Sequence, residues 1–329
     1  MDRDLQKDLF VLIKESLPSH ISLVDSIGDL LDISYDSVYR RIRGEKQLSL
    51  NELKKICSHY QLSLDQLFGL KNETVLFDAP QMNGLSSLFD VYLENMLKQF
   101  KYFNSFEKKE MNYLCKDSTL WNFYLFPELA AFKTFFWSKT INQQPDLHDK
   151  AFSFEEFPFT ECFKTGQQIL HEYNEIPSLE LWNLESMQST INQISYYNEA
   201  GNFKSHADFE LVLESFHKTI SHLQLQAEKG VKFMPGATDV SYKAPIQFYV
   251  NELILGNNTM VITLNSKKLT MITYSVLHYL FTRNSDFSDR VLDSFNVLLA
   301  RSTLISKVGE RERNRFFNTL RQKINALRG

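Results

Sequence analysis

The feature that most constrains this chain is the segment LVDSIGDLLDISYDSVYRRIRGEKQLSLNELKKICSHYQLSLDQLFG, which spans residues 23–69. Apolar residues recur in it at helical spacing, and residues that begin or end helices separate the repeats. The residues placed to cap or end these helices are Ser34, Gly44, Ser49 and Ser63. Helices are expected over residues 5–17, 22–31, 35–43, 50–60 and 64–68. Such short helices can bury their apolar faces only by packing together, so residues 1–70 are predicted to form one compact bundle.

Three residues spaced five positions apart indicate how two of these helices pack. A helix-turn-helix needs a small residue in its first helix, an apolar residue after the turn and an apolar anchor in the second helix. Those positions hold Gly28, Ile33 and Val38. The side predicted to be buried carries Leu30, Leu31, Val38 and Ile42. The side predicted to face outward carries Tyr35, Asp36, Tyr39, Arg40 and Arg43.

This segment resembles the lambda-repressor-like (Cro/XRE-type) helix-turn-helix family, and the resemblance covers residues 1–70 only. It extends past the two helices to Gly44, to the leucines of residues 48–53, and to the Leu-Ser-Leu-Asp sequence at residues 62–65. The resemblance implies that a recognition helix, residues 35–43, enters the major groove of double-stranded DNA. The implied base-contacting residues are Tyr35, Asp36, Ser37, Tyr39 and Arg40. Basic side chains and helix starts suited to phosphate contact are Ser34, Arg43, Lys46 and Ser49.

Two residues depart from the family pattern. Asp32 stands where the family usually has glycine at the turn, and Val24 stands where a phosphate-contacting glutamine is common. Aspartate tolerates left-handed backbone better than most residues, so the turn is expected to form. Valine offers no hydrogen bond, so no phosphate contact is expected at that position.

Local charge matters more than the formal net charge of −4. Residues 2–37 have a balance of −5, whereas residues 38–55 have a balance of +4, which is the kind of local basic surface that phosphate binding needs. The alternative is that Arg40, Arg41 and Arg43 only solvate a helix face, with Asp36 as the partner of Arg40. Set within the whole bundle pattern, the basic residues favour DNA.

The remainder of the chain is expected to form a second domain. Residues 71–84 gather Asn, Asp, Pro and Gly and are interpreted as a linker, followed by a domain over residues 85–329. Helices are expected over residues 85–106, 107–140, 159–174, 178–200, 206–229, 286–306 and 310–327. Alternating β-branched and aromatic residues near 246–275 predict a small antiparallel β-meander. The predicted fold class is therefore mainly α: a five-helix DNA-binding domain plus a larger α-rich domain with that meander.

Nothing in the sequence points to catalysis or to a bound cofactor. The three cysteines, Cys57, Cys115 and Cys162, form no CxxC pair, and the eight histidines show no HExxH motif, so neither a disulfide framework nor a metal site is expected. No nucleophile-elbow, dinucleotide-binding or phosphate-loop motif is found, so the chain is not expected to be an enzyme. The sequence also shows no signal peptide and no apolar run long enough to span a membrane, which favours the cytoplasm.

Two features of the second domain leave alternatives open. An aromatic cluster could line a ligand pocket or form ordinary core, and consists of Trp121, Phe123, Tyr124, Phe126, Phe132, Phe135, Phe136 and Trp137. The last predicted helix lies within residues 307–328, which have a balance of +5, and it could dock on the second domain with a solvated basic face. It could instead serve dimerisation or contact phosphate.

These patterns favour a transcriptional regulator, prokaryotic by its resemblance, that binds double-stranded DNA as a homodimer. The second domain is expected to supply the dimer contact and to respond to a small-molecule or protein effector. The rival hypothesis is a protein-interaction scaffold whose N-terminal bundle binds no DNA, and the acidic balance of residues 2–37 supports it. A third hypothesis is an antitoxin-like repressor with a protein partner.

Overall fold

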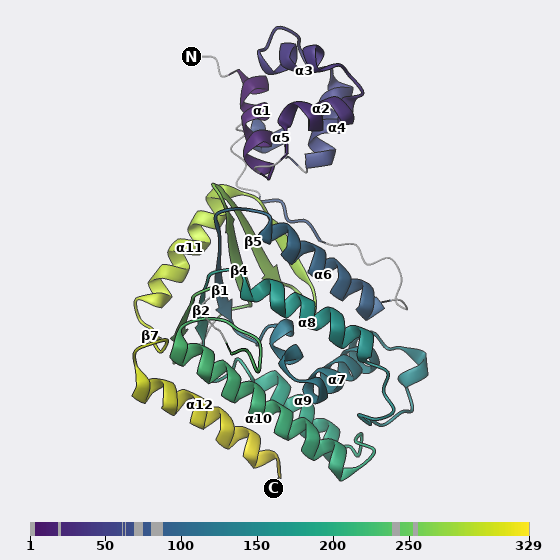
Figure 1. Ribbon diagram of the computed structural model, residues 1–329, viewed down its shortest axis with the longest axis vertical. Coiled ribbons are helices and arrows are strands. Elements are labelled where there is room, and N and C mark those ends of the chain that lie inside the picture. The colour runs from purple at the N-terminus through teal and green to yellow at the C-terminus, as the bar shows by residue number, and fades with distance from the viewer. Residues whose placement is uncertain are drawn as a thin grey trace.

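The computed structural model describes residues 4–18, 21–60, 62, 64–68, 75–79, 88–238, 244–252 and 256–328. An N-terminal group of helices is followed by a larger part built around a sheet (Figure 1). Within the described ranges no helix combines the length and the apolar character that crossing a bilayer requires. The predicted cap Ser63 and the predicted linker residues 71–74 and 80–84 lie outside the described residues.

The N-terminal part contains the helices that the sequence predicts. They are α1 (Leu5–Ser16), α2 (Leu23–Leu31), α3 (Tyr35–Ile42), α4 (Leu50–Tyr60) and α5 (Leu64–Leu67). One apolar cluster holds them together, with Leu9, Phe10, Ile13, Ile27, Leu31, Val38, Ile56 and Leu67 buried. Each short helix contributes one apolar face to this cluster, which is why periodicity alone located them.

The second part is built on a sheet of seven strands in the order β6-β5-β4-β1-β2-β3-β7. The strands are β1 (Lys109–Cys115), β2 (Ser178–Trp182), β3 (Ile246–Val250), β4 (Thr259–Leu264), β5 (Lys267–Thr273), β6 (Tyr279–Thr282) and β7 (Thr303–Leu304). Strands β1, β2 and β3 run parallel to their neighbours in that trio, whereas β4, β5, β6 and β7 pair antiparallel. Helical connections join the parallel strands, as parallel pairing requires.

Helices cover both faces of this sheet (Figure 1). They are α6 (Leu88–Asn104), α7 (Pro127–Phe136), α8 (Thr160–Asn174), α9 (Gln188–Glu199), α10 (His206–Lys229), α11 (Ser285–Leu299) and α12 (Glu310–Asn325). On one face Phe295 of α11 packs with Leu114 of β1 and Leu181 of β2. On the other face β2 meets α8, where Tyr173 donates a hydrogen bond to the buried Glu180.

The predicted fold class is wrong for this second part, because a mixed α/β sheet replaces the small meander. Strand β1 lies inside the predicted helix 107–140, and β2 begins the predicted helix 178–200. Both strands are interior, and in β2 the polar Ser178 and Glu180 are buried while Leu179 is half-buried, so polar residues do not mark a solvent-facing side as they do in a half-exposed strand. Strand β3 also leaves the predicted meander, since it pairs with β2 and not with β4.

The structure shows where the last helix and the aromatic cluster lie. Helix α12 packs along α10, where Arg321 donates to Gln224 at 2.6 Å, and Arg328, just after α12, pairs with Glu210 at 2.8 Å. Some of the basic side chains at this end of the chain therefore serve docking, while Arg311 and Arg315 stay exposed. Seven of the eight cluster aromatics are buried and Phe126 is half-buried, so most of the cluster is core.

Several contacts link the N-terminal part and the linker to the sheet, and two sets of hydrogen bonds are the clearest. Asp78 exchanges two backbone hydrogen bonds with Phe281 of β6, at 2.8 and 3.0 Å. Lys267, at the start of β5, donates to the backbone oxygen of Leu12 in α1 at 2.8 Å. The edge strand β6 and the β4–β5 turn are thus the parts of the sheet that meet the N-terminal region.

Candidate nucleic-acid interface

The turn between α2 and α3 has the geometry that the sequence predicts. Asp32 ends α2 in the left-handed conformation, with φ 54° and ψ 54°, so the prediction that aspartate would support this turn is confirmed. The Ile33 N–H donates to the Gly28 oxygen at 3.1 Å and closes the turn. A Cβ on Gly28 would lie 3.4 Å from the Ile33 oxygen and 3.7 Å from the Tyr35 ring, so the small residue sits where the turn passes closest.

Helix α3 is amphipathic in the predicted sense. Val38 is fully buried against Ile27 and Leu31 of α2, and Ile42 is half-buried beside them. Ser34 caps the helix, since its hydroxyl accepts a hydrogen bond from the Ser37 N–H at 3.4 Å. This anchoring fixes which side of α3 faces away from the bundle.

The outward side of α3 carries the predicted base-contacting residues. Tyr35 is 60% exposed and Tyr39 is 51% exposed, while Asp36 and Arg40 are exposed and Ser37 is half-buried. In Figure 1 this helix lies at the end of the N-terminal bundle that points away from the sheet. A rigid, solvated helix face about two turns long is thereby available to a partner.

The arginines of α3 divide between the two sides of the helix. Arg41 is only 3% exposed and its guanidinium pairs with Glu52 of α4 at 2.6 Å, while also donating to the Ser37 oxygen at 3.0 Å. Arg40 remains exposed. The view that all three arginines only solvate a helix face therefore fails for Arg41. Because Arg41 and Glu52 leave the surface as a pair, the local charge of residues 38–55 available to a partner stays at +4.

Glu52 has a second role at the start of α4. Its carboxylate accepts the Ser49 N–H at 2.8 Å, and the Ser49 hydroxyl accepts the Glu52 N–H at 3.2 Å, which forms a capping box. Burial raises the pKa of Glu52, but the Ser49 N–H and the Arg41 guanidinium outweigh it and hold the pKa below its usual value. The Ser49 N–H is therefore already donated within the protein, which leaves its hydroxyl for a phosphate contact.

A residue that the sequence reasoning missed fixes the loop after α3. Gln6 of α1 donates to the backbone oxygens of Arg41 at 2.7 Å and Lys46 at 2.8 Å, and it accepts the Leu48 N–H at 2.8 Å. These bonds set the position of the predicted phosphate contact Lys46. Nothing near Gln6 in the sequence signals this contact, because its partners lie 35 to 42 residues away.

The remaining charges near α3 are mixed. The predicted phosphate contact Arg43 is exposed and pairs with Glu45 at 2.9 Å, an exposed pair that a phosphate could replace at small cost. On the opposite side, a hydrogen bond from the Tyr35 hydroxyl to the Asp25 carboxylate raises the pKa of Tyr35, and the charge of Asp29 adds to this effect. The first turn of α3 thus lies beside carboxylates, while its last turn and the following loop are basic. In the described ranges, no three His, Cys, Asp or Glu side chains gather closely enough to hold a metal ion.

Comparison with known families gives one match, to the BetR domain, over residues 20–91. This part of the chain, which includes α2 to α5 and the first turn of α6, is similar to that domain. The match covers less than half of the chain and does not itself establish a lambda-repressor-like domain. No curated protein and no solved structure matches the chain.

Proposed function

We propose that this protein is a sequence-specific DNA-binding regulator of transcription whose α3 enters the major groove. The observation that carries the proposal is the pairing of a tightly closed α2–α3 turn at Asp32 with an outward face of α3 that is exposed and polar. On that face Arg40 has the chemistry to read guanine, and Asp36 to accept a hydrogen bond from cytosine or to orient Arg40.

Phosphate contacts in this proposal come from the end of α3 and the loop after it. Arg43 and Lys46 are exposed there, and Gln6 holds the loop that carries Lys46. Ser34 and Ser49 are exposed at the starts of α3 and α4, and their hydroxyls add uncharged phosphate contacts. The carboxylates beside Tyr35 oppose DNA approach, so we expect modest affinity for random DNA. The basic phosphate contacts make this affinity fall as the salt concentration rises.

Three further parts of the proposal concern the whole protein. A single recognition helix reads only one half-site, so we infer a symmetric homodimer, with the dimer contact in the part that follows residue 88. That part also receives the effector, a small molecule or a protein. We place the protein in a prokaryotic cytoplasm, where its DNA target is accessible.

The test uses duplexes selected from a random pool by the full-length protein, with binding followed by fluorescence anisotropy at several salt concentrations. Arg40→Ala should weaken binding to the selected duplex at least about tenfold and relax the preference at one base position. Lys46→Ala should weaken all duplexes about equally and lower the salt slope by about 1. Arg290→Ala, which removes an exposed charge from α11, is the matched control and should bind like the wild type.

A wild-type protein with no measurable duplex affinity at low salt would refute the proposal and favour the protein-interaction scaffold. If duplexes bind but Arg40→Ala and Lys46→Ala behave like Arg290→Ala, the placement of α3 in the groove is wrong. Sedimentation of the protein with a selected duplex then tests the homodimer, since a stoichiometry of one chain per duplex would contradict it.

A further inference from the structure

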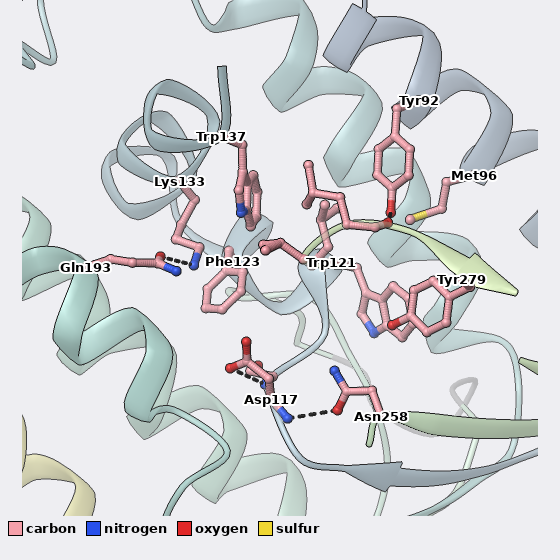
Figure 2. Close-up of a pocket in the computed structure, with 14 residues that line it drawn as sticks. Tyr92, Met96, Asp117, Trp121, Phe123, Lys133, Trp137, Gln193, Asn258 and Tyr279 are labelled. Atoms are coloured by element: carbon pink, nitrogen blue, oxygen red, sulfur yellow. Dashed lines mark hydrogen bonds between the residues drawn. The ribbon is translucent and has the colours of Figure 1, made fainter. Parts of the chain in front are cut away.

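A polar cavity lies at the end of the sheet where β1 ends and the antiparallel β4 begins. Asp117 follows β1, whose neighbours are the parallel β2 and the antiparallel β4, and Asn258 directly precedes β4. The Asp117 N–H donates to the Asn258 side-chain oxygen at 2.8 Å and joins the two ends (Figure 2). In open α/β sheets, ligands bind outside the carboxyl ends of the parallel strands, and Asp117 follows that end of β1.

The cavity is small and has both polar and aromatic walls. Its volume is about 40 Å³, room for roughly three water-sized groups, and the cavity is partly open to solvent, so a slightly larger molecule can extend outward. The lining residues are Tyr92, Met96, Asp117, Ser118, Leu120, Trp121, Phe123, Lys133, Trp137, Gln193, Asn258, Val276, Leu277 and Tyr279. Three of the aromatics that the sequence grouped as a cluster, Trp121, Phe123 and Trp137, therefore line this cavity, while the other five do not.

Lys133 brings a buried positive charge to one wall. Its side chain is 2% exposed, and its ammonium lies 4.2 Å from the centre of the Phe123 ring and 4.8 Å from that of Trp137. It donates to Gln193 at 2.6 Å (Figure 2) and to Thr190 at 3.1 Å, and both of these partners are neutral. Burial lowers the pKa of Lys133 to about 8, although the charge of Asp117 opposes this. An ammonium has three donors, so one N–H remains after these two hydrogen bonds.

Asp117 brings a negative charge to the facing wall. Its carboxylate accepts the Ser118 N–H at 3.1 Å. Burial raises the pKa of Asp117, while the positive charge of Lys133 is the largest influence in the other direction. The two groups are within electrostatic range of each other, yet they form no direct ion pair. Lys133 is buried and Asp117 is half-buried, so these opposite charges are costly to hold without direct contact, and a molecule that touches both would relieve that cost.

Two further polar atoms beside the cavity have no partner. The indole nitrogen of Trp121 and the hydroxyl of Ser118 are buried and form no hydrogen bond. Buried donors of this kind are rare in folded proteins and call for a specific explanation. Both belong to the segment that runs directly from the end of β1 into the cavity wall.

We propose that this cavity binds a small α-amino acid as a zwitterion, with its ammonium on Asp117 and its carboxylate toward Lys133. A primary ammonium supplies the N–H donors that the Asp117 carboxylate can accept, and a carboxylate accepts the remaining Lys133 N–H. The molecule as a whole is neutral, so it adds no net charge to the buried site. A small apolar side chain then meets Met96, Leu120 and Val276.

The walls of the cavity include the elements that flank the connection to the N-terminal helices. Tyr92 of α6 donates to the Leu277 oxygen at 2.6 Å, and Tyr279 belongs to β6, the strand that pairs with Asp78. A bound ligand would therefore contact both α6, which follows Asp78 in the chain, and β6, which pairs with Asp78. The binding proposal itself is independent of DNA binding, since every group in it belongs to the second part of the chain.

The test is isothermal titration of the full-length protein with L-alanine, glycine and L-serine. Propionate, which lacks the ammonium, and ethylamine, which lacks the carboxylate, are the matched half-ligands. We expect saturable binding of at least one amino acid and at least about tenfold weaker binding of both half-ligands, because each loses one charged contact. Trp121 and Trp137 line the cavity, so their fluorescence gives an independent measure of the same binding.

Two substitutions locate the site. Asp117→Asn keeps the shape of the side chain and should weaken amino-acid binding at least about tenfold, and Lys133→Met should do the same. Lys139→Met is the matched control, because Lys139 also lies near an aromatic ring but outside the cavity. Circular dichroism checks that each variant is folded, and Asp117→Asn alone decides the matter if Lys133→Met does not fold. The proposal is overturned if none of the three amino acids binds, if propionate binds as well as L-alanine, or if Asp117→Asn binds unchanged.

Discussion

The two parts of this protein build their structures from different kinds of contact. In residues 4–68 the most closely packed helices, α2 and α3, follow one another in sequence and are joined by a single turn at Asp32, although α1 also packs against α3 and α5. In the sheet, Lys109 of β1 pairs with Leu264 of β4, and β2 pairs with β3 across α9 and α10. Local patterns therefore carry most of the information about the first part and much less about the second.

The two parts also differ in whether a buried charged side chain has a partner of opposite charge in direct contact. In the N-terminal helices, the buried Arg41 has a direct partner in Glu52, and the pair joins α3 to α4. In the sheet part, Lys133 and Asp117 share a cavity without pairing directly. The first arrangement stabilises the fold, whereas the second leaves charge available for a ligand.

The sharpest test of the comparison uses a glycine inside a helix of the sheet part. In α8, a Cβ on Gly166 would lie 2.1 Å from the ring of Tyr124, which is fully buried. Gly166→Ala should therefore lower the free energy of unfolding by about 3 kcal/mol, although alanine is the better helix former. Denaturant unfolding followed by tryptophan fluorescence measures this, because all three tryptophans, Trp121, Trp137 and Trp182, lie in this part. An unchanged midpoint would mean that α8 and the Tyr124 segment pack less closely than described.

A smaller effect is expected from the charged pair of the N-terminal part. Arg41→Met should destabilise α3 and α4 by about 1–2 kcal/mol at neutral pH, a moderate loss because Glu52 keeps some solvent contact. Hydrogen exchange of peptides from residues 23–60 in the full chain measures it. Exchange in α8 and in the sheet should stay unchanged if the two parts are independent, and a parallel loss there would break the comparison.

The Arg41–Glu52 pair also predicts that the stability of α3 and α4 depends on pH. The pKa of Glu52 is lowered in the folded protein, so its contribution is present above the unfolded value of about 4.3 and is lost as pH falls through the lower folded value. The wild-type protection of residues 23–60 should therefore fall in acid, and the fall should be smaller in Arg41→Met. Equal acid dependence in both proteins would show that the pair does not set it.

The smallest effect is expected for the glycine that corresponds to Gly166 in the other part. A Cβ on Gly28 meets only ordinary contacts, the nearest at 3.4 Å, so Gly28→Ala should be neutral or stabilise α2 by up to about 0.5 kcal/mol. Hydrogen exchange of α2 in the full chain again provides the measurement. A loss comparable to that of Gly166→Ala would mean that the α2–α3 turn is packed as tightly as the sheet part.

Much of the candidate interface could be predicted because its signals are local. Capping serines, the left-handed Asp32 and the spacing of Gly28, Ile33 and Val38 all act within a few residues, and the outward position of Tyr35, Tyr39 and Arg40 followed from helical periodicity. Their DNA contacts stay a prediction. The inward turn of Arg41 could not be predicted, since it depends on Glu52 in the next helix.

Sequence alone determined the five N-terminal helices and which side of α3 is apolar, because hydrogen bonds within helices and caps involve residues near one another. Tertiary structure decided that residues 109–115 and 178–182 are strands, because their partners are supplied by distant segments and both of their faces are covered. Tertiary structure also created the cavity. Asp117 and Lys133 line one space only because β1 pairs with β4 and because α7, which carries Lys133, lies near the end of β1. Burial of this kind depends on where the whole chain places its elements, and no local pattern encodes it.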